Sequence, residues 1–98
     1  MTIDEFRALV SAPAPPGGSS DALQSLWWDA KGDWDRAHAC AQRDPTPSAA
    51  GVHAYLHRKA GDMSNAAGWY RRAGRTPPVV SLAAEWESLA QELLGVQD

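Results

Sequence analysis

The sequence predicts an all-α fold made of two antiparallel helical hairpins, with a capping helix at the N-terminal end and another at the C-terminal end. Apolar residues recur at helical spacing, and no alternating apolar pattern bounded by turns indicates a strand. A Gly-Asp pair occurs at 32–33 and again at 61–62, an offset of 29 residues that is typical of stacked helical hairpins. The length of 98 residues fits one domain spanning residues 1–98.

The first segment combines a short helix with an irregular strap. Thr2 followed by Glu5 is a capping-box pattern, and Ile3 and Phe6 then share one helical face. Residues 12–20 contain three prolines and two glycines, which disfavour a helix. We therefore expect residues 12–20 to connect the first helix to the rest of the fold without regular structure.

The first hairpin is predicted around the first Gly-Asp pair. A serine pair at 19–20 can cap a helix that runs to about Lys31. Gly32 suits the position after a helix end because glycine tolerates positive φ, and Asp33 suits the N-cap of the next helix. That next helix should end before Pro45, since the residue preceding a proline avoids the α conformation.

The second hairpin repeats this arrangement. Ser48 can cap a helix over about 49–60, the pair at 61–62 forms the corner, and a helix over about 63–73 follows. A final helix is predicted within 81–95, capped by the serine at its start and ended by the glycine.

Composition and charge exclude several classes of protein. The net charge of −3 and a pI near 5.5 give no electrostatic argument for binding nucleic acid or an anionic membrane. The single cysteine, Cys40, cannot form an intrachain disulfide. The N-terminal residues lack a signal-peptide pattern, and no apolar run approaches the roughly 20 residues of a membrane span. We expect a cytoplasmic protein.

One stretch also carries a family pattern. It has a small residue within a helix, a Gly-Asp turn, and an aromatic-basic-alanine phrase before a proline: Ala54, Gly61, Asp62, Ala66, Trp69–Ala73 and Pro78. On these residues, the segment 49–78 resembles one tetratricopeptide-type repeat of the SEL-like branch, and the segment 20–45 resembles it more weakly. The resemblance implies a TPR-like stack of two hairpins with the terminal helices as caps. The sequence of the whole chain also resembles those of short bacterial proteins.

Adjacent aromatic residues give expectations about the core. Neighbours on a helix point about 100° apart, so both cannot face the same core. Trp28 matches the interior aromatic of the repeat, whereas Trp27 either packs beneath the first helix and the strap or is exposed. By the same pattern Tyr70 points inward, and Trp69 faces the neighbouring hairpin or solvent.

The resemblance implies a binding function. TPR-like folds expose a concave face from the first helix of each hairpin, so we expect a non-enzymatic protein–protein interaction module. Its partner would be a protein or peptide, or a second copy of the chain, and no catalytic signature or cofactor is indicated. Basic residues near the second hairpin suit an acidic peptide or phosphate, or alternatively pair internally with Glu85 or Glu87. The expected binding residues are Leu26, Asp29, Tyr55, Arg58, Lys59, Trp69 and Arg72.

The alternative is a small-molecule or metal site, with possible catalysis, around His53 and His57. These residues are four apart on a predicted helix, which is a metal-ligand spacing. Two histidines alone make no site, so we expect no metal unless a third ligand comes from His38, Asp29 or Cys40. The neighbouring aromatic residues for such a site would be Trp28 and Trp69. The test is geometric: the second hypothesis gains if the imidazoles converge without hydrogen-bond partners.

Overall fold

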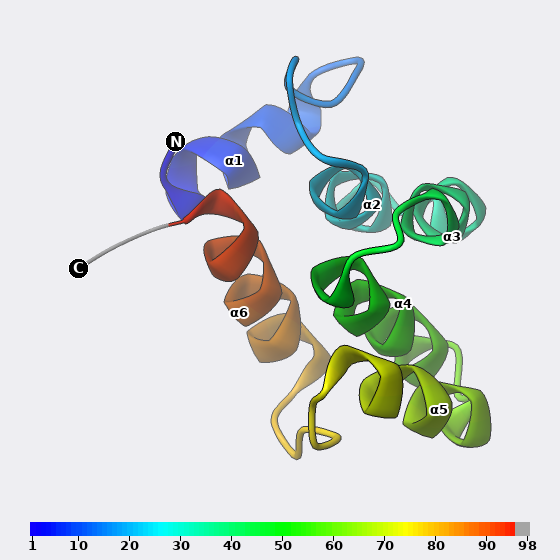
Figure 1. The fold of residues 1–98 in the computed structure, drawn as a ribbon. Coiled ribbons are helices and arrows are strands. Elements are labelled where there is room, and N and C mark those ends of the chain that lie inside the picture. Colours follow the sequence, from blue (N-terminus) through cyan, green and yellow to red (C-terminus); the bar gives the residue numbers. More distant parts are fainter. Residues whose placement is uncertain (96–98) are drawn as a thin grey trace.

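Helix α4 (Pro47–Lys59) lies at the centre of the computed structural model, which describes residues 1–95 (Figure 1). It packs against four of the other five α-helices, and every residue from Ala49 to His57 is buried. A helix buried on all sides has no solvent face to spare, so polar side chains on α4 need partners on the neighbouring helices. The four neighbours of α4 are α2 (Asp21–Ala30), α3 (Trp34–Arg43), α5 (Met63–Ala73) and α6 (Leu82–Leu94). The remaining helix, α1 (Ile3–Ala8), packs against α6.

The two predicted Gly-Asp corners are confirmed. Gly32 and Gly61 have φ of 88° and 82°, the left-handed region that favours glycine. The backbone N–H of the following aspartate reaches back to the carbonyl of Trp28 in one corner and of His57 in the other, 2.9 Å in both. Each aspartate side chain then accepts a hydrogen bond from the first turn of the next helix, from Arg36 N for Asp33 and Asn65 N for Asp62. The chain therefore makes the same tight turn twice.

Besides the two aspartates, three further predicted helix caps are present and one differs. The capping box of Thr2 and the caps Ser20 and Ser81 are all present. Helix α4 begins at Pro47 with Thr46 as its cap, rather than after Ser48. The reason is that proline suits the first helical position, where its missing N–H costs nothing.

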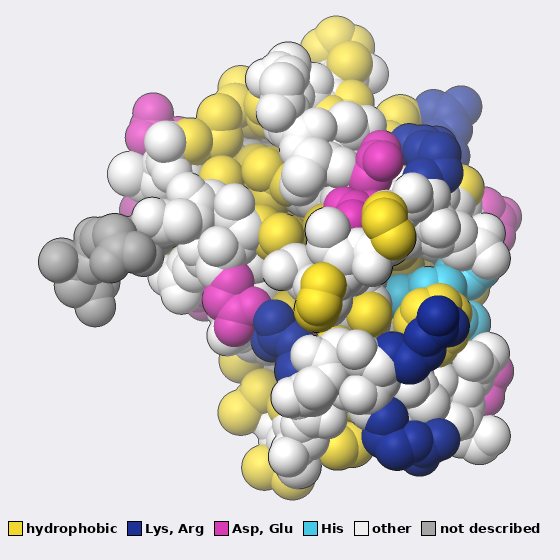
Figure 2. Space-filling model, viewed as in Figure 1, with side chains coloured by type: hydrophobic (Ala, Val, Ile, Leu, Met, Phe, Trp, Pro, Cys, Tyr) yellow, Lys and Arg dark blue, Asp and Glu magenta, His cyan; other side chains and the backbone are white. Residues whose placement is uncertain are grey.

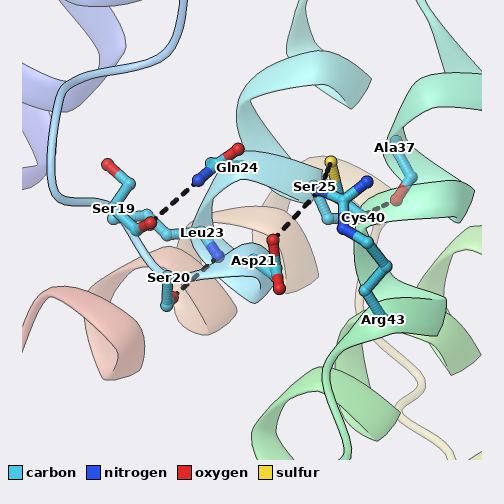
Figure 3. A network of polar contacts seen from close by, with 9 residues as sticks. All are labelled: Ser19, Ser20, Asp21, Leu23, Gln24, Ser25, Ala37, Cys40 and Arg43. Carbon is cyan, nitrogen blue, oxygen red and sulfur yellow. Dashed lines mark hydrogen bonds and ion pairs between the residues drawn. The ribbon is translucent and has the colours of Figure 1, made fainter.

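The first hairpin is held by side chains that reach from α2 to α3 (Figure 3). The hydroxyl of Ser25, fully buried, donates to the carbonyl of Ala37 at 2.6 Å. Near the other end of the hairpin, the Arg43 guanidinium bonds the carboxylate of Asp21 at 3.0 Å and the Cys40 sulfur at 3.3 Å. Ser25 occupies the position where the repeat pattern expects a small residue, which lets the two helices approach closely.

The last helix lies where the sequence does not predict it. Instead of capping the end of the second hairpin, α6 packs against both α2 and α4 (Figure 1). The indole N–H of Trp86 donates to the carbonyl of Leu26 at 3.0 Å, and Phe6 of α1 stacks on Trp86 with ring centroids 5.9 Å apart. Helix α6 thus covers the face that the first helices of the two hairpins were expected to leave open. The all-α class with antiparallel neighbours is confirmed.

Of the two adjacent tryptophans in the first hairpin, Trp27 packs beneath the first helix, which was one of its two expected places, and Trp28 differs from the expectation. Trp27 is fully buried and donates its indole N–H to the carbonyl of Leu9, in the 3₁₀ turn that follows α1. Trp28, the residue expected in the interior, is half-buried, with Arg36 over its ring. In the second hairpin Tyr70 is buried, as predicted, whereas Trp69 is half-buried and stacks on His53 of its own hairpin rather than facing only the neighbouring hairpin or solvent.

Membrane insertion finds no support in these helices. None of those within residues 1–95 combines the length and the apolar content needed to cross a bilayer.

Candidate functional site

The three histidines of the chain meet where α3 packs on α4. His53 and His57 lie one turn apart on α4, and His38 reaches them from α3. One ring nitrogen from each of the three lies within 4.8 Å of the other two. The third ligand that the sequence left open is therefore His38. Asp29 and Cys40, the other two candidates, have their partners elsewhere, in Tyr55 and Arg43.

The imidazoles are in direct contact. The Nε2 atoms of His53 and His38 are 2.9 Å apart, so one nitrogen carries the shared proton and the other accepts it. The rings of His53 and His57 stack at a centroid distance of 4.9 Å, and His38 stands edge-on to both. We call His38, His53 and His57 the histidine cluster.

Two tryptophans hold the rings of the histidine cluster in place. Trp69 of α5 stacks on His53 with centroids 3.8 Å apart, and the Arg72 guanidinium lies over the outer face of Trp69 at 4.6 Å. Trp34 stacks on His38 at 4.8 Å and donates its indole N–H to the carbonyl of Leu56. Flat rings packed on both sides lose little further conformational freedom when a ligand binds.

Burial favours the neutral form of His53 and of His38 by lowering the pKa of each. His53 is only 2% exposed, and this burial lowers its pKa to about 4, with the nearby His38, His57 and Arg72 acting in the same direction. Burial also lowers the pKa of His38, and the charge of His57 adds to that effect. Neutral imidazole is the form that coordinates a metal ion.

One buried atom of the cluster lacks a partner. Among the side chains of residues 1–95, the Nδ1 of His53 is the buried polar atom without a hydrogen bond. Leaving such a group unsatisfied costs about 1–3 kcal/mol, so native proteins rarely keep one without a functional reason.

The cluster fits a transition metal better than a hard cation. Imidazole nitrogen suits zinc, copper, nickel and iron, whereas calcium and magnesium take oxygen ligands. Tetrahedral zinc with bonds near 2.1 Å places its ligand nitrogens about 3.4 Å apart, so the His38–His53 contact would open by about half an ångström. His38 is half-buried, and histidine side chains reach the surface as one strip beside Lys and Arg side chains (Figure 2). Small ions can therefore enter from solvent.

A different set of polar side chains occupies the opposite side of α4. Asp29 accepts hydrogen bonds from the hydroxyl of Tyr55 at 2.6 Å and from the Lys59 ammonium at 2.8 Å. Burial, and next this hydrogen bond to Asp29, raise the pKa of Tyr55, which keeps the phenol protonated.

A second buried carboxylate repeats this arrangement. Glu85 of α6 accepts from Tyr70 at 2.6 Å and from the Arg58 guanidinium at 2.7 Å. We call the two groups the carboxylate networks. Their members are Asp29, Tyr55 and Lys59 in one, and Glu85, Tyr70 and Arg58 in the other.

The expected binding residues fall into two groups that the structure does not join. Trp69 and Arg72 lie beside the histidine cluster. Leu26, Asp29 and Tyr55 were expected on an open concave face, and they are buried instead, with exposed fractions of 0%, 4% and 3%. The physical reason is that α6 packs across α2 and α4. Arg58 and Lys59 pair with the two buried carboxylates.

Sequence reasoning gave Trp34 no role at the site, named His38 only as one of three candidate third ligands, and named Glu85 only as one of several carboxylates that could pair with arginines. One signal was available for His38, because it lies four residues after Trp34 on the face of α3 that carries Ala37 and Ala41. No local signal indicates that Glu85 faces Tyr70, since that contact depends on how α6 crosses the bundle. The chain matches no known family model, no curated protein and no solved structure.

Proposed function

We propose that this protein binds a divalent transition metal ion, zinc or a metal of similar preference, through His38, His53 and His57. The observation that carries the proposal is the convergence of ring nitrogens from the three histidines of the chain. Random placement of three histidines on six helices would rarely stack them against one another.

Three imidazoles and no further ligand define the kind of site. Structural zinc sites are closed by four protein ligands, whereas three-ligand sites keep a position for water or a small molecule. Within the described residues, the group that could hold a metal ion contains these three histidines and no carboxylate or thiol. The proposed site is therefore open, and an ion bound there would supply Lewis-acid character to whatever occupies the remaining position.

The direct test is a calorimetric titration of the purified chain with Zn²⁺, Ni²⁺ and Mg²⁺. We expect saturable binding of the first two at one ion per chain and none of Mg²⁺. Because an ion that binds only the native state stabilises it, Zn²⁺ at 100 times its Kd should add about 2.7 kcal/mol to the free energy of unfolding.

Two variants separate the cluster from the other soft ligand of the chain. His38→Ala removes the most accessible histidine and should weaken Zn²⁺ binding at least about tenfold. Cys40→Ala is the matched control, since its thiol bonds Arg43 and lies outside the cluster, and it should bind Zn²⁺ like the parent. Unchanged Zn²⁺ binding in His38→Ala, or none in the parent chain, would overturn the proposal.

A second candidate function rests on the surface of α5. An open hollow of about 870 Å³ is lined by Trp69, Arg71 and Arg72, with polar groups from the N-terminal half of α5. Among residues 1–95, neither arginine has a carboxylate within ion-pair distance. Asp62, the N-cap of α5, also lines the hollow, so the lining carries two guanidinium groups and one carboxylate, and this net positive charge suits an acidic peptide.

We therefore keep protein interaction as the second proposal, on a pair of hairpins arranged like tetratricopeptide repeats. The matching corners at Gly32 and Gly61 support this arrangement. An Arg71→Ala/Arg72→Ala variant should lose salt-sensitive binding of a glutamate-rich peptide, measured by fluorescence anisotropy. Equal binding by the variant and the parent would contradict this second function.

A further inference from the structure

A separate hollow of about 400 Å³ lies on the side of α4 away from the histidine cluster, between α2, α4 and α6. Its size falls within the range of small-molecule sites in proteins. We call it the α2/α4/α6 pocket. Its lining residues are Arg7, Asp29, Ala30, Tyr55, Lys59, Leu82, Ala83 and Trp86.

Much of the lining is apolar and rigid. Trp86 is held by its hydrogen bond to the carbonyl of Leu26 and by stacking on Phe6. Leu82 and Ala83 of α6 and Ala30 of α2 add aliphatic surface. A wall of this kind favours a ligand with an aromatic or branched apolar body.

The polar part of the pocket is built around Asp29. Its carboxylate is only 3% exposed, and its two oxygens accept from Tyr55 and Lys59. The negative charge of Asp29 is therefore compensated inside the protein. This network fixes Tyr55 and Lys59 at the pocket wall and leaves Asp29 with no unpaired charge to offer a cationic ligand.

The basic side chains at the pocket wall can still donate hydrogen bonds to a ligand. An ammonium has three donors, and within residues 1–95 Lys59 uses one of them in its hydrogen bond to Asp29. The Arg7 guanidinium lies 5.7 Å from the centre of the Trp86 ring. Its contacts with Asp4 and Glu87 measure 3.5 and 3.6 Å, too long for strong hydrogen bonds, and all three side chains are at least 44% exposed. Two cations with donors to spare therefore border one apolar pocket.

We propose that the α2/α4/α6 pocket binds a small organic carboxylate whose apolar body packs on Trp86 and whose carboxylate is held by Arg7 and Lys59. The charge of the pocket lining supports this choice, because Lys59 compensates Asp29 and the Arg7 guanidinium leaves the lining with a net charge of about +1. The site is separate from the histidine cluster and needs no metal.

The test is a titration of the ¹⁵N-labelled chain with phenylacetate in the presence of EDTA, followed by NMR. We expect saturable shifts at the Trp86 indole and at backbone amides of α2, α4 and α6. Two analogues of equal shape, 2-phenylethanol and phenethylamine, should bind at least about tenfold more weakly, because they lack the charge that Arg7 and Lys59 recognise.

Three variants make the result specific. Ala83→Phe places a ring in the pocket from an exposed position of α6, so it should abolish binding without disturbing the core. Ala84→Phe, also exposed but outside the lining, is its matched control and should bind phenylacetate like the parent. Arg7→Gln should remove most of the preference for phenylacetate over 2-phenylethanol. No saturable binding, no preference for the carboxylate, or equal binding by Ala83→Phe and the parent would overturn the proposal.

Discussion

The two sides of α4 carry polar groups that are satisfied to different degrees. On the side of Tyr55 and Lys59, each buried carboxylate accepts from a tyrosine and a basic side chain. On the side of His53 and His57, about 200° around the helix, three imidazoles crowd together and one ring nitrogen has no partner.

This difference suggests that the carboxylate networks serve stability, whereas the histidine cluster serves the proposed binding function. A completed network of buried charges holds α2, α4, α5 and α6 in one arrangement, and breaking it is costly. A crowded group of histidines adds little to folding, and proteins retain such groups where they bind something. The comparison predicts that the same helix responds very differently to substitution on its two sides.

The largest effect is expected from Glu85→Ala. This change leaves the Arg58 guanidinium and the Tyr70 hydroxyl without their shared acceptor in a buried place, so the free energy of unfolding should fall by about 3–5 kcal/mol. Urea denaturation measures it. Glu92→Ala breaks the exposed pair with Arg75 and should cost less than about 1 kcal/mol. Similar losses in both variants would remove the distinction between the buried networks and surface ion pairs.

The next effect is a pH dependence of the metal-free protein. The pKa of His53 is about 4 in the native state against 6.5 ordinarily, so between these values the unfolded chain binds a proton that the native chain does not. Stability contributed by neutral His53 is thus complete above pH 6.5 and falls with decreasing pH. The loss should reach about 2 kcal/mol at pH 5, measured by urea denaturation in EDTA. His53→Phe should flatten this curve, and an equally steep curve in that variant would assign the dependence to other groups.

A smaller effect compares the two hairpin corners. Alanine at Gly32 or Gly61 meets no neighbouring atom within 4 Å, so its cost comes from the positive φ alone, about 1 kcal/mol at each corner. The costs should add in the double variant because the corners are distant. Gly17→Ala, in the strap and without a positive φ, is the control and should change stability by less than about 0.5 kcal/mol. Unequal costs at the two corners would show that the two hairpins are not equivalent.

The smallest effect is expected from His53→Phe in the metal-free chain. Phenylalanine keeps the stacking on Trp69 and removes the unpartnered nitrogen, so stability near pH 7 should change by less than about 1 kcal/mol. Zn²⁺ binding should nevertheless be lost in calorimetry. A loss of several kcal/mol would mean that the histidine cluster is as important for folding as the carboxylate networks.

Local chemistry made most helices predictable. The corner glycines, the aspartate caps and the helix over 63–73 follow from residue preferences within a few positions, and the structure confirms them. The start of α4 was misplaced because proline at its first position and Thr46 as its cap compete with Ser48. Each of these features depends on only one turn of backbone.

The candidate site was predictable only in part, because its geometry depends on contacts between distant segments. The spacing of His53 and His57 indicates a shared face, yet nothing local indicates that His38 reaches them rather than Asp29 or Cys40. The burial of Asp29 and Tyr55 likewise follows from where α6 packs, which no periodicity within α6 specifies. Composition and spacing can identify candidate residues, but they do not predict which of these residues contact one another in the fold.

The hydrogen bond from Trp86 to Leu26 joins residues 60 positions apart, whereas each hairpin closes through contacts between consecutive helices. Closing long loops carries an entropic penalty that short loops avoid, so the two hairpins can form quickly and independently. Contacts between α3 and α4 join the two hairpins directly, and docking of α6 on α2 and α4 then adds the contacts that span the most sequence. The rate at which the native protein assembles is set less by its repeated corners than by the arrival of this one helix.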